Sequence, residues 1–187
     1  MRPRLRRSVV GFACLALGTL CAAAFPGIGV RAQPASEPQL KTVQPNDVKA
    51  LIAANKGKVV FLNFFATYCV PCHKEFPDIV KLQAKYKAAG LEVVEISMND
   101  ASDPADRAEM AKYLDQTKPT FAVYLASSID DDFYKGVDPK WAADGEALPM
   151  TTIFDRDGKV AHFYEKALSF EEMERDVTPL LKASASN

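Results

Sequence analysis

Two cysteines stand three positions apart in the segment Ala66-Thr67-Tyr68-Cys69-Val70-Pro71-Cys72-His73-Lys74-Glu75-Phe76-Pro77. The mostly apolar run Val59–Phe65 precedes this segment, and an amphipathic stretch that ends at Gly90 follows it. The pattern predicts a buried strand that leads into a helix, with Cys69 at the start of the helix. Unpaired N–H groups and partial positive charge at a helix start stabilise a thiolate. Because a thiolate attacks disulfides and a second thiol resolves the product, the two cysteines predict thiol–disulfide exchange.

The first 32 residues have the composition of a secretory signal peptide. An arginine-rich start at residues 2–7 precedes an apolar run at residues 9–25, and small residues around Ala32 fit a cleavage site. We therefore expect cleavage after Ala32 and export to the periplasm. A retained membrane anchor is the alternative, and the apolar run is slightly short for a membrane-spanning helix.

Cysteine count and charge narrow the function further. Of the four cysteines, Cys14 and Cys21 lie in the predicted signal peptide, so the exported chain keeps only Cys69 and Cys72. One pair that closes so short a loop stabilises a fold very little, which indicates that the pair serves chemistry. Cleavage removes five of the 23 basic residues and none of the 24 acidic ones, which leaves a formal charge of −6. This charge argues against nucleic acid and anionic membrane surfaces as partners.

The rest of the pattern predicts one α/β domain over residues 43–182, after a polar tether at 33–42 and before a flexible tail at 183–187. A short helix capped by Asn46 or Asp47 is expected first, and residues 127–148 are expected to be irregular, with Trp141 as a local core plug. The predicted strands cover 59–65, 91–97, 121–125, 151–154 and 160–164, with a hairpin turn at 155–158. The predicted helices cover 70–89 and 104–116, the second capped by Asp103, and a final helix is capped by Ser169.

This order of elements, with the cysteine pair after the first core strand, resembles the thioredoxin fold. It is most similar to the exported TlpA/ResA-like thiol–disulfide oxidoreductases. The resemblance rests on residues 60–72, on Glu75-Phe76-Pro77 and on residues 148–158. It covers about Val43 to Leu181 and implies a mixed central sheet flanked by helices.

The resemblance also implies roles for individual residues. Cys69 is expected to be the attacking thiolate and the more exposed cysteine, and Cys72 the resolving thiol. Pro149 matches the cis-proline of the family, whose loop faces the start of the helix that carries the cysteines. The residues expected to contact substrate are Tyr68, Val70, Pro71, Leu148 and Pro149.

Two positions depart from the family pattern. The family usually has Trp where this chain has Tyr68. Thioredoxins themselves carry a buried Asp where this chain has Asn63, and an amide cannot accept the proton of Cys72. Glu75 lies one helical turn beyond Cys72 and matches an acidic position of the exported branch, which implies that it carries this proton. The alternative for Glu75 is a solvated carboxylate on the helix surface.

The direction of the reaction follows from the residues between the cysteines. Strong oxidants of this fold typically have a His there, and Val70-Pro71 offers no such donor. We therefore expect a reductant of partner-protein disulfides in cytochrome c maturation or copper-site assembly, recharged by a membrane electron donor. A disulfide-forming oxidant of the same fold is the alternative. No cofactor or metal beyond the Cys69–Cys72 pair is expected, and the chain is expected to be a monomer.

Other classes of protein fit parts of the sequence. Residues 69–73 also match the C-x-x-C-H pattern of haem attachment, so a c-type cytochrome electron carrier is the main alternative. The predicted strands argue against it, because small cytochromes are mostly helical. A copper site on the two thiols and either His73 or His162 is a third hypothesis. Asp130-Asp131-Asp132 lacks the Gly and Glu spacing of a calcium loop and is expected to be solvated.

Overall fold

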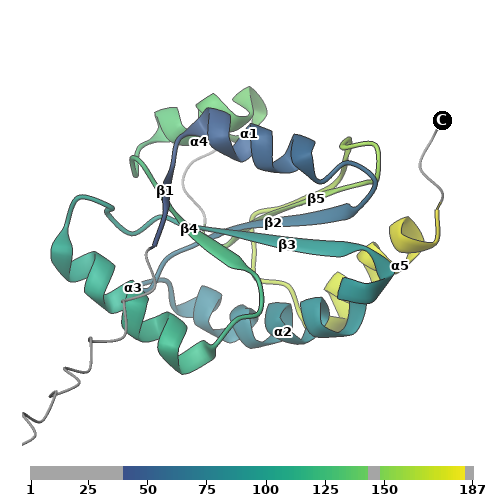
Figure 1. Cartoon of the computed structure of the whole chain (residues 1–187), viewed down its shortest axis with the longest axis horizontal. Coiled ribbons are helices and arrows are strands. Elements are labelled where there is room, and N and C mark those ends of the chain that lie inside the picture. The colour runs from purple at the N-terminus through teal and green to yellow at the C-terminus, as the bar shows by residue number, and fades with distance from the viewer. Residues whose placement is uncertain (1–39, 143–147, 184–187) are drawn as a thin grey trace, which may run out of the picture. The chain divides into compact units, whose positions relative to one another are not determined.

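A mixed sheet organises the part of the chain that the computed structural model describes, residues 40–142 and 148–183 (Figure 1). Within these residues the strand order is β1-β4-β3-β2-β5-β6. The first four strands in this order are parallel, and β5 and β6 are antiparallel to their neighbours. The strands are β1 (Thr42–Val43), β2 (Val59–Phe65), β3 (Leu91–Ser97), β4 (Ala122–Ala126), β5 (Met150–Phe154) and β6 (Val160–Tyr164). The predicted α/β class and mixed sheet are confirmed.

Some of the predicted segments at the two ends of the chain lie outside the described residues. The predicted signal peptide, the tether up to residue 39 and the tail from residue 184 lie outside them. Leu40 is buried and Thr42 opens β1, so the last residues of the predicted tether take part in the fold.

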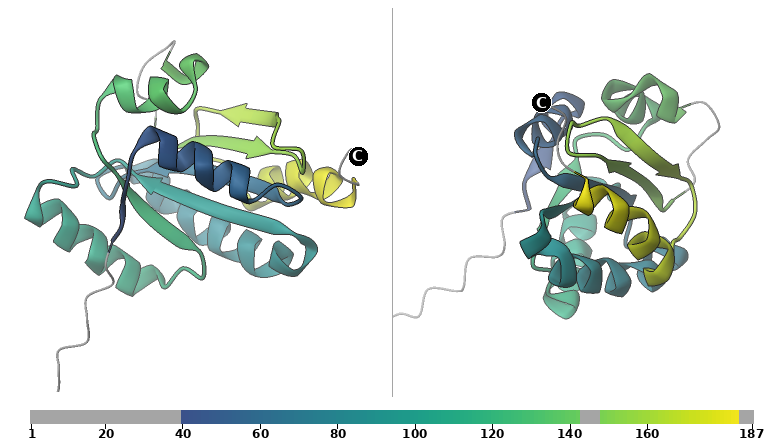
Figure 2. Two further views of the ribbon diagram at one scale, coloured as in Figure 1. Left: turned by 45° about the horizontal axis from the view of Figure 1, so that its top comes forward. Right: turned by 90° about the vertical axis from the view of Figure 1, so that its right-hand side faces the viewer.

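Helices cover both faces of the sheet. Figures 1 and 2 show α1 (Pro45–Ala54) and α4 (Asp131–Val137) over one face. The opposite face is covered by α2 (Val70–Tyr86), α3 (Pro104–Thr117) and α5 (Phe170–Lys182). Successive side chains of a strand point to opposite faces, so a strand between two helical layers must be apolar on both. Accordingly, all seven residues of β2 are buried.

One predicted helix start differs from the structure. The first helix begins at Pro45 with Gln44 as its cap, because the Gln44 N–H donates to the Asp47 carboxylate at 2.8 Å. Asp47 therefore closes the cap from inside the helix, and the prediction of Asn46 or Asp47 as the cap is wrong. The predicted caps Asp103 for α3 and Ser169 for α5 are confirmed.

The segment predicted to be irregular contains helices. The Asp130 side chain accepts the N–H of Phe133 at 3.1 Å and caps α4, and Asp131 and Asp132 occupy its first turn. Carboxylates are favourable at a helix N-terminus, which explains the acidic run that was expected to be a solvated loop. A short 3₁₀ helix, η2 (Pro139–Ala142), follows. The helix predicted to end at Ala89 ends at Tyr86 and tightens into the 3₁₀ turn η1 (Lys87–Ala89).

Trp141 fills the space over one end of the sheet. Its ring lies 5.6 Å from that of Phe64 in an edge-on arrangement and stacks 6.5 Å from that of Phe163. The indole is buried, and its partners are apolar rings that contribute area and specific geometry. The prediction of a local core plug is confirmed.

Arg156, in the turn between β5 and β6, ties three chain segments together. One guanidinium nitrogen donates to the Gly57 carbonyl at 2.6 Å. Another donates to the carbonyls of Ala89 at 3.1 Å and Leu181 at 2.8 Å. Gly57 lies in the turn before β2, Ala89 ends η1 and Leu181 lies in the last turn of α5, so the single side chain joins three separate segments at one end of the sheet.

Replacing Arg156 should therefore loosen the fold. Arg156→Met keeps the apolar stem and removes three hydrogen bonds to carbonyls, so we expect the free energy of unfolding in urea to fall by about 2 kcal/mol. Lys159→Met is the matched control, because its ammonium lies 3.9 Å from Asp157 at the surface. The control should change stability by less than about 0.5 kcal/mol. Equal effects of the two substitutions would contradict this account.

Candidate functional site

Cys69 and Cys72 form a disulfide at the start of α2. Cys69 is the N-cap residue, and its Sγ accepts the Cys72 N–H at 3.3 Å. Pro71 stands at the second helical position, where a missing N–H costs nothing. On reduction, the same N–H group and the helix dipole favour negative charge on the Cys69 sulfur.

The two sulfurs differ in exposure, as predicted. Cys69 is 8% exposed and Cys72 is 2% exposed. Cys72 faces the interior of the domain, whereas Cys69 lines a surface pocket. Cys69 is therefore the more accessible residue of the pair.

A buried polar network holds the loop before Cys69. The Asn99 side chain accepts the Thr67 N–H at 3.0 Å and donates to the Thr67 hydroxyl at 2.6 Å. The Ser97 hydroxyl donates to the same Asn99 oxygen at 2.9 Å. His73 is exposed, and its Nε2 contacts the Thr67 carbonyl. These bonds fix the backbone from which Cys69 projects.

A surface pocket of about 440 Å³ opens beside the disulfide. Leu148 lines the pocket and precedes Pro149 through a cis peptide bond, which confirms the predicted cis-proline. Tyr68 and Val70 stand at the pocket with 64% and 67% of their surface exposed. The other lining residues are Cys69, Pro71, Met98, Ile129 and Tyr134.

The pocket brings together four of the five predicted substrate-contact residues, and the fifth, Pro149, adjoins Leu148. The sequence analysis missed Met98, Ile129 and Tyr134, which come from the end of β3 and from the 127–148 segment. These residues are apolar or aromatic and distant in sequence, so only the folded sheet and α4 reveal that they share the pocket. Exposed apolar side chains around a reactive sulfur suit contact with a polypeptide.

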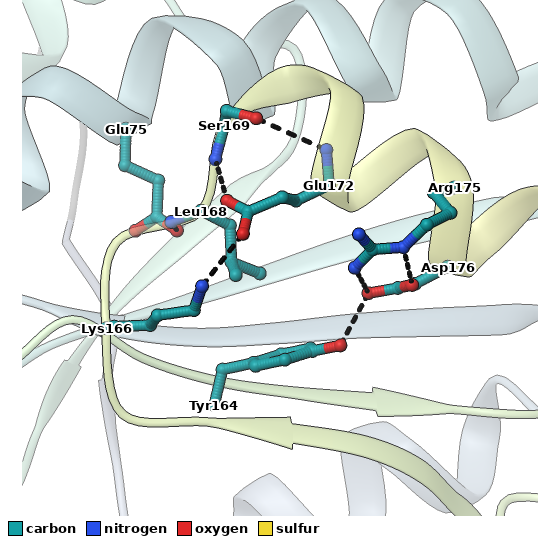
Figure 3. A network of polar contacts seen from close by, with 8 residues as sticks. All are labelled: Glu75, Tyr164, Lys166, Leu168, Ser169, Glu172, Arg175 and Asp176. Carbon is teal, nitrogen blue, oxygen red and sulfur yellow. Dashed lines mark hydrogen bonds and ion pairs between the residues drawn. The ribbon is translucent and has the colours of Figure 1, made fainter.

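Glu75 is buried beneath the disulfide end of α2, with 2% of its surface exposed. One carboxylate oxygen accepts the Leu168 N–H at 2.9 Å, and the other lies 3.4 Å from the Asn63 amide nitrogen. Figure 3 shows the Glu75 carboxylate beside Leu168, next to the capping pair of Ser169 and Glu172 that opens α5. The alternative of a solvated helix carboxylate is wrong.

Burial raises the pKa of Glu75 to about 7, and the hydrogen bonds from Leu168 and Asn63 only partly offset it. The charges of Asp78 and Glu172 push the pKa further in the same direction. A carboxyl group with a pKa near neutrality can both accept and return a proton at physiological pH. Glu75 thus has the proton affinity of a general base, one helical turn from Cys72.

A second buried carboxyl group, Glu95, was also missed by the sequence analysis. It lies in the middle of β3, fully buried, in register with Asn63 of β2. Burial and the charge of Glu75 raise the pKa of Glu95 well above its usual range. The signal in the sequence is a single acidic residue inside the apolar run Val93–Ile96.

The structure contradicts the hypothesis that the C-x-x-C-H motif attaches haem. Haem attachment uses both cysteine sulfurs of a C-x-x-C-H motif, and here the two sulfurs are bonded to each other within a mixed sheet. Within the described residues, no three His, Cys, Asp or Glu side chains cluster as a metal site would require.

The difference in exposure predicts an order of alkylation. In the reduced protein at neutral pH, a small alkylating reagent should modify Cys69 about tenfold faster or more than Cys72, because thiolate character and access both favour Cys69. Peptide mass spectrometry after short exposure measures the two rates. Cys72→Ser should leave the rate at Cys69 nearly unchanged, and modification of Cys72 first would contradict the assignment.

Comparison with known proteins agrees with this geometry. The family model described as Redoxin matches residues 29–178. The chain is 33% identical over 127 residues to the thiol-disulfide oxidoreductase ResA of Bacillus thuringiensis subsp. konkukian, covering 66% of each chain, just under two thirds of the relative. It is 27% identical over 179 residues to ResA of Bacillus subtilis, covering 95% of this chain and 92% of the relative.

A solved structure supports the fold. The thiol:disulfide interchange protein of the thioredoxin family from Chlorobium tepidum superimposes with a TM-score of 0.57 at 24% identity. The superposition covers 69% of this chain and 83% of that one. The thioredoxin fold expected from the sequence is confirmed, and the hypothesis of a c-type cytochrome is wrong. The chain belongs to the Redoxin family, and its fold, its disulfide and its named relatives are those of a thiol–disulfide oxidoreductase.

Proposed function

We propose that this protein is a periplasmic thiol–disulfide oxidoreductase that reduces disulfides of partner proteins. The observation that carries the proposal is the disulfide at the start of α2, with Cys69 the more exposed sulfur on an apolar pocket and Cys72 buried above Glu75. This arrangement separates an attacking sulfur, a resolving sulfur and a group that takes up a proton.

The reaction proceeds in two exchanges. In the reduced protein the Cys69 thiolate attacks one sulfur of the partner disulfide, which forms a mixed disulfide and releases the other partner sulfur as a thiolate. Cys72 then loses its proton and attacks the Cys69 sulfur, which forms the Cys69–Cys72 bond and releases the second partner sulfur. The partner disulfide gains two electrons, and the Cys69–Cys72 pair loses two.

Glu75 is proposed to accept the proton of Cys72 in the second exchange. Its carboxylate is buried on the same helix, one turn from Cys72, where water has little access. A pKa of about 7 leaves a large fraction of Glu75 ionised and ready to accept a proton at neutral pH. Glu75 also opposes a lasting negative charge on Cys72, since both groups would be buried and anionic.

The proposal also covers how the protein binds its partner proteins and where in the cell it acts. Tyr68, Val70 and Ile129 present exposed apolar surface around Cys69, which fits a segment of partner polypeptide. The relatives named ResA support an exported role, and the arginine-rich, apolar start of the chain fits export. Within the described residues no helix is long and apolar enough to cross a membrane. A membrane electron donor would return two electrons to the disulfide, and cytochrome c maturation and copper-site assembly are the two pathways proposed.

The reducing direction predicts a low reduction potential. The span from thioredoxin at about −270 mV to a strong oxidant at about −120 mV corresponds to about 7 kcal/mol of extra stability in the reduced form. A helix start supplies about 0.3–2 kcal/mol, and buried Glu75 acts against a second anion. We therefore expect a potential below about −200 mV, measured by equilibration with glutathione and thiol counting. A value near −120 mV would make the protein an oxidant.

The role of Glu75 predicts the pH dependence of the resolving step. The folded protein raises the pKa of Glu75 to about 7, so the ionised base appears as pH rises toward 7. The rate of resolution in wild type should rise with pH up to about 7 and then level off. In Glu75→Gln the rise should shift toward the pKa of the thiol itself, about 8.5 or higher, with a loss of about tenfold at pH 7.

Stopped-flow measurement of resolution with a mixed disulfide of Cys69 would provide both profiles. Glu109→Gln is the matched control, because Glu109 lies exposed on α3. The control profile should coincide with that of wild type. An unchanged profile in Glu75→Gln would remove Glu75 from the reaction and leave the cysteine roles intact.

A further inference from the structure

Three buried oxygen atoms near Glu75 lack a hydrogen-bond partner among the described residues. They are the Asn63 amide oxygen and both carboxyl oxygens of Glu95. An unsatisfied polar atom in a protein interior costs about 1–3 kcal/mol, and an unpaired buried charge costs more. The two side chains are neighbours, because Asn63 of β2 and Glu95 of β3 are direct partners in parallel strands.

One protonation state would pair two of these three oxygen atoms with each other. An ionised Glu95 and the Asn63 oxygen are both acceptors and cannot bond to each other. A neutral Glu95 carries an O–H donor, and the strands are about 4.8 Å apart, so its longer side chain can reach the amide oxygen of Asn63. Burial independently favours the neutral form.

The Asn63 amide then connects Glu95 to the redox site. Its nitrogen donates to the Thr151 hydroxyl at 2.9 Å and lies 3.4 Å from the Glu75 carboxylate. The Thr151 hydroxyl can also donate, so Thr151 does not by itself decide which way the amide faces. A donor at the opposite side, on Glu95, would hold the amide with its nitrogen toward Glu75.

We propose that Glu95 is a positioning residue: its neutral carboxyl group donates to the Asn63 amide oxygen and thereby keeps the Asn63 nitrogen directed at the Glu75 carboxylate. The proposal rests on the proposed function of Glu75 for its consequence in catalysis, whereas the hydrogen bond from Glu95 to Asn63 is argued from strand register and from the unpartnered oxygen atoms of both side chains.

Several charged or titratable side chains lie near Glu75 and Glu95 and influence the pH at which each carboxyl group ionises. Glu75 from α2 interacts with Glu95, and Glu95 interacts with Tyr113 from α3. Asp78 and Glu172 act on Glu75 from α2 and α5. Glu75 accepts hydrogen bonds from Leu168 and Asn63, whereas Glu95 is fully buried and accepts none among the described residues, so Glu75 should ionise first while Glu95 stays protonated.

Loss of the donor should raise the proton affinity of Glu75. Without it, the Asn63 amide can turn its oxygen toward Glu75, and an oxygen there is compatible only with protonated Glu75. Glu95→Met removes the donor at similar length, so we expect proton binding at Glu75 to tighten about threefold, which is about half a pH unit. Glu95→Gln keeps an N–H donor and should restore the wild-type midpoint.

Carbon-13 NMR of labelled glutamate side chains measures these midpoints in the oxidised protein. In wild type the Glu95 signal should keep its protonated position while Glu75 titrates near pH 7. Glu92→Gln is the matched control, because Glu92 lies on the same strand and pairs with Lys58 at the surface. It should leave the Glu75 midpoint unchanged.

Two results would overturn the proposal. Ionisation of Glu95 at or below the midpoint of Glu75 would do so in wild type, whether or not Glu95→Met folds. Equal Glu75 midpoints in the Gln and Met variants would do so as well. NMR measures the proton affinity of the two carboxyl groups and not enzymatic turnover. The test therefore decides the role of Glu95 even if the protein shows no disulfide reductase activity.

Discussion

Burial of strand β2 on both faces is the constraint on which the other features depend. The strand lies between β3 and β5, and helices cover both of its faces, so none of its side chains reaches water. The backbone N–H and C=O groups of β2 form hydrogen bonds with β3, which is parallel to it, and with β5, which is antiparallel. Any polar side chain on this strand must find its partners inside the protein, and Asn63 is the residue that has to do so.

This constraint also sets the geometry of the redox site. The chain leaves the rigid strand through a loop held by Asn99 and enters α2 directly at Cys69. The reactive sulfur is thus fixed by the best-buried element of the fold and by a satisfied polar network. Part of the pocket lining, by contrast, comes from loops and a short helix, since Leu148, Ile129 and Tyr134 reach the pocket from the 127–148 segment.

Much of the fold could be predicted because local patterns were unambiguous. The apolar run before Cys69, the capping Asp103 and Ser169, and the Asp155–Gly158 turn each act over a few residues, and the structure contains the elements they predict. The cis bond before Pro149 followed from a motif resemblance and is present in the structure, whereas the roles of the two cysteines stay predictions. Helix α4 was missed because its acidic first turn was interpreted as solvated sequence.

The environment of the carboxyl groups could not be predicted in the same way. The depth of Glu75 depends on Leu168, which is 93 residues away in sequence and contacts it only once α5 docks. Glu95 meets Asn63 through strand register, and the 440 Å³ pocket depends on α4. Each of these contacts is long-range, whereas propensity and spacing report on neighbours along the chain.

Burial of Glu75 also couples the folding of the domain to protons. In an unfolded chain this carboxyl group would titrate near its ordinary pKa of 4.5, whereas in the folded domain its pKa is about 7. Between these two values the folded state binds more protons than the unfolded state, so stability falls as pH rises through this window. Above pH 7 the loss is complete, and it amounts to about 3 kcal/mol for a shift of this size. The domain therefore gives up part of its resistance to unfolding at neutral pH in order to keep an ionisable group beneath its cysteines.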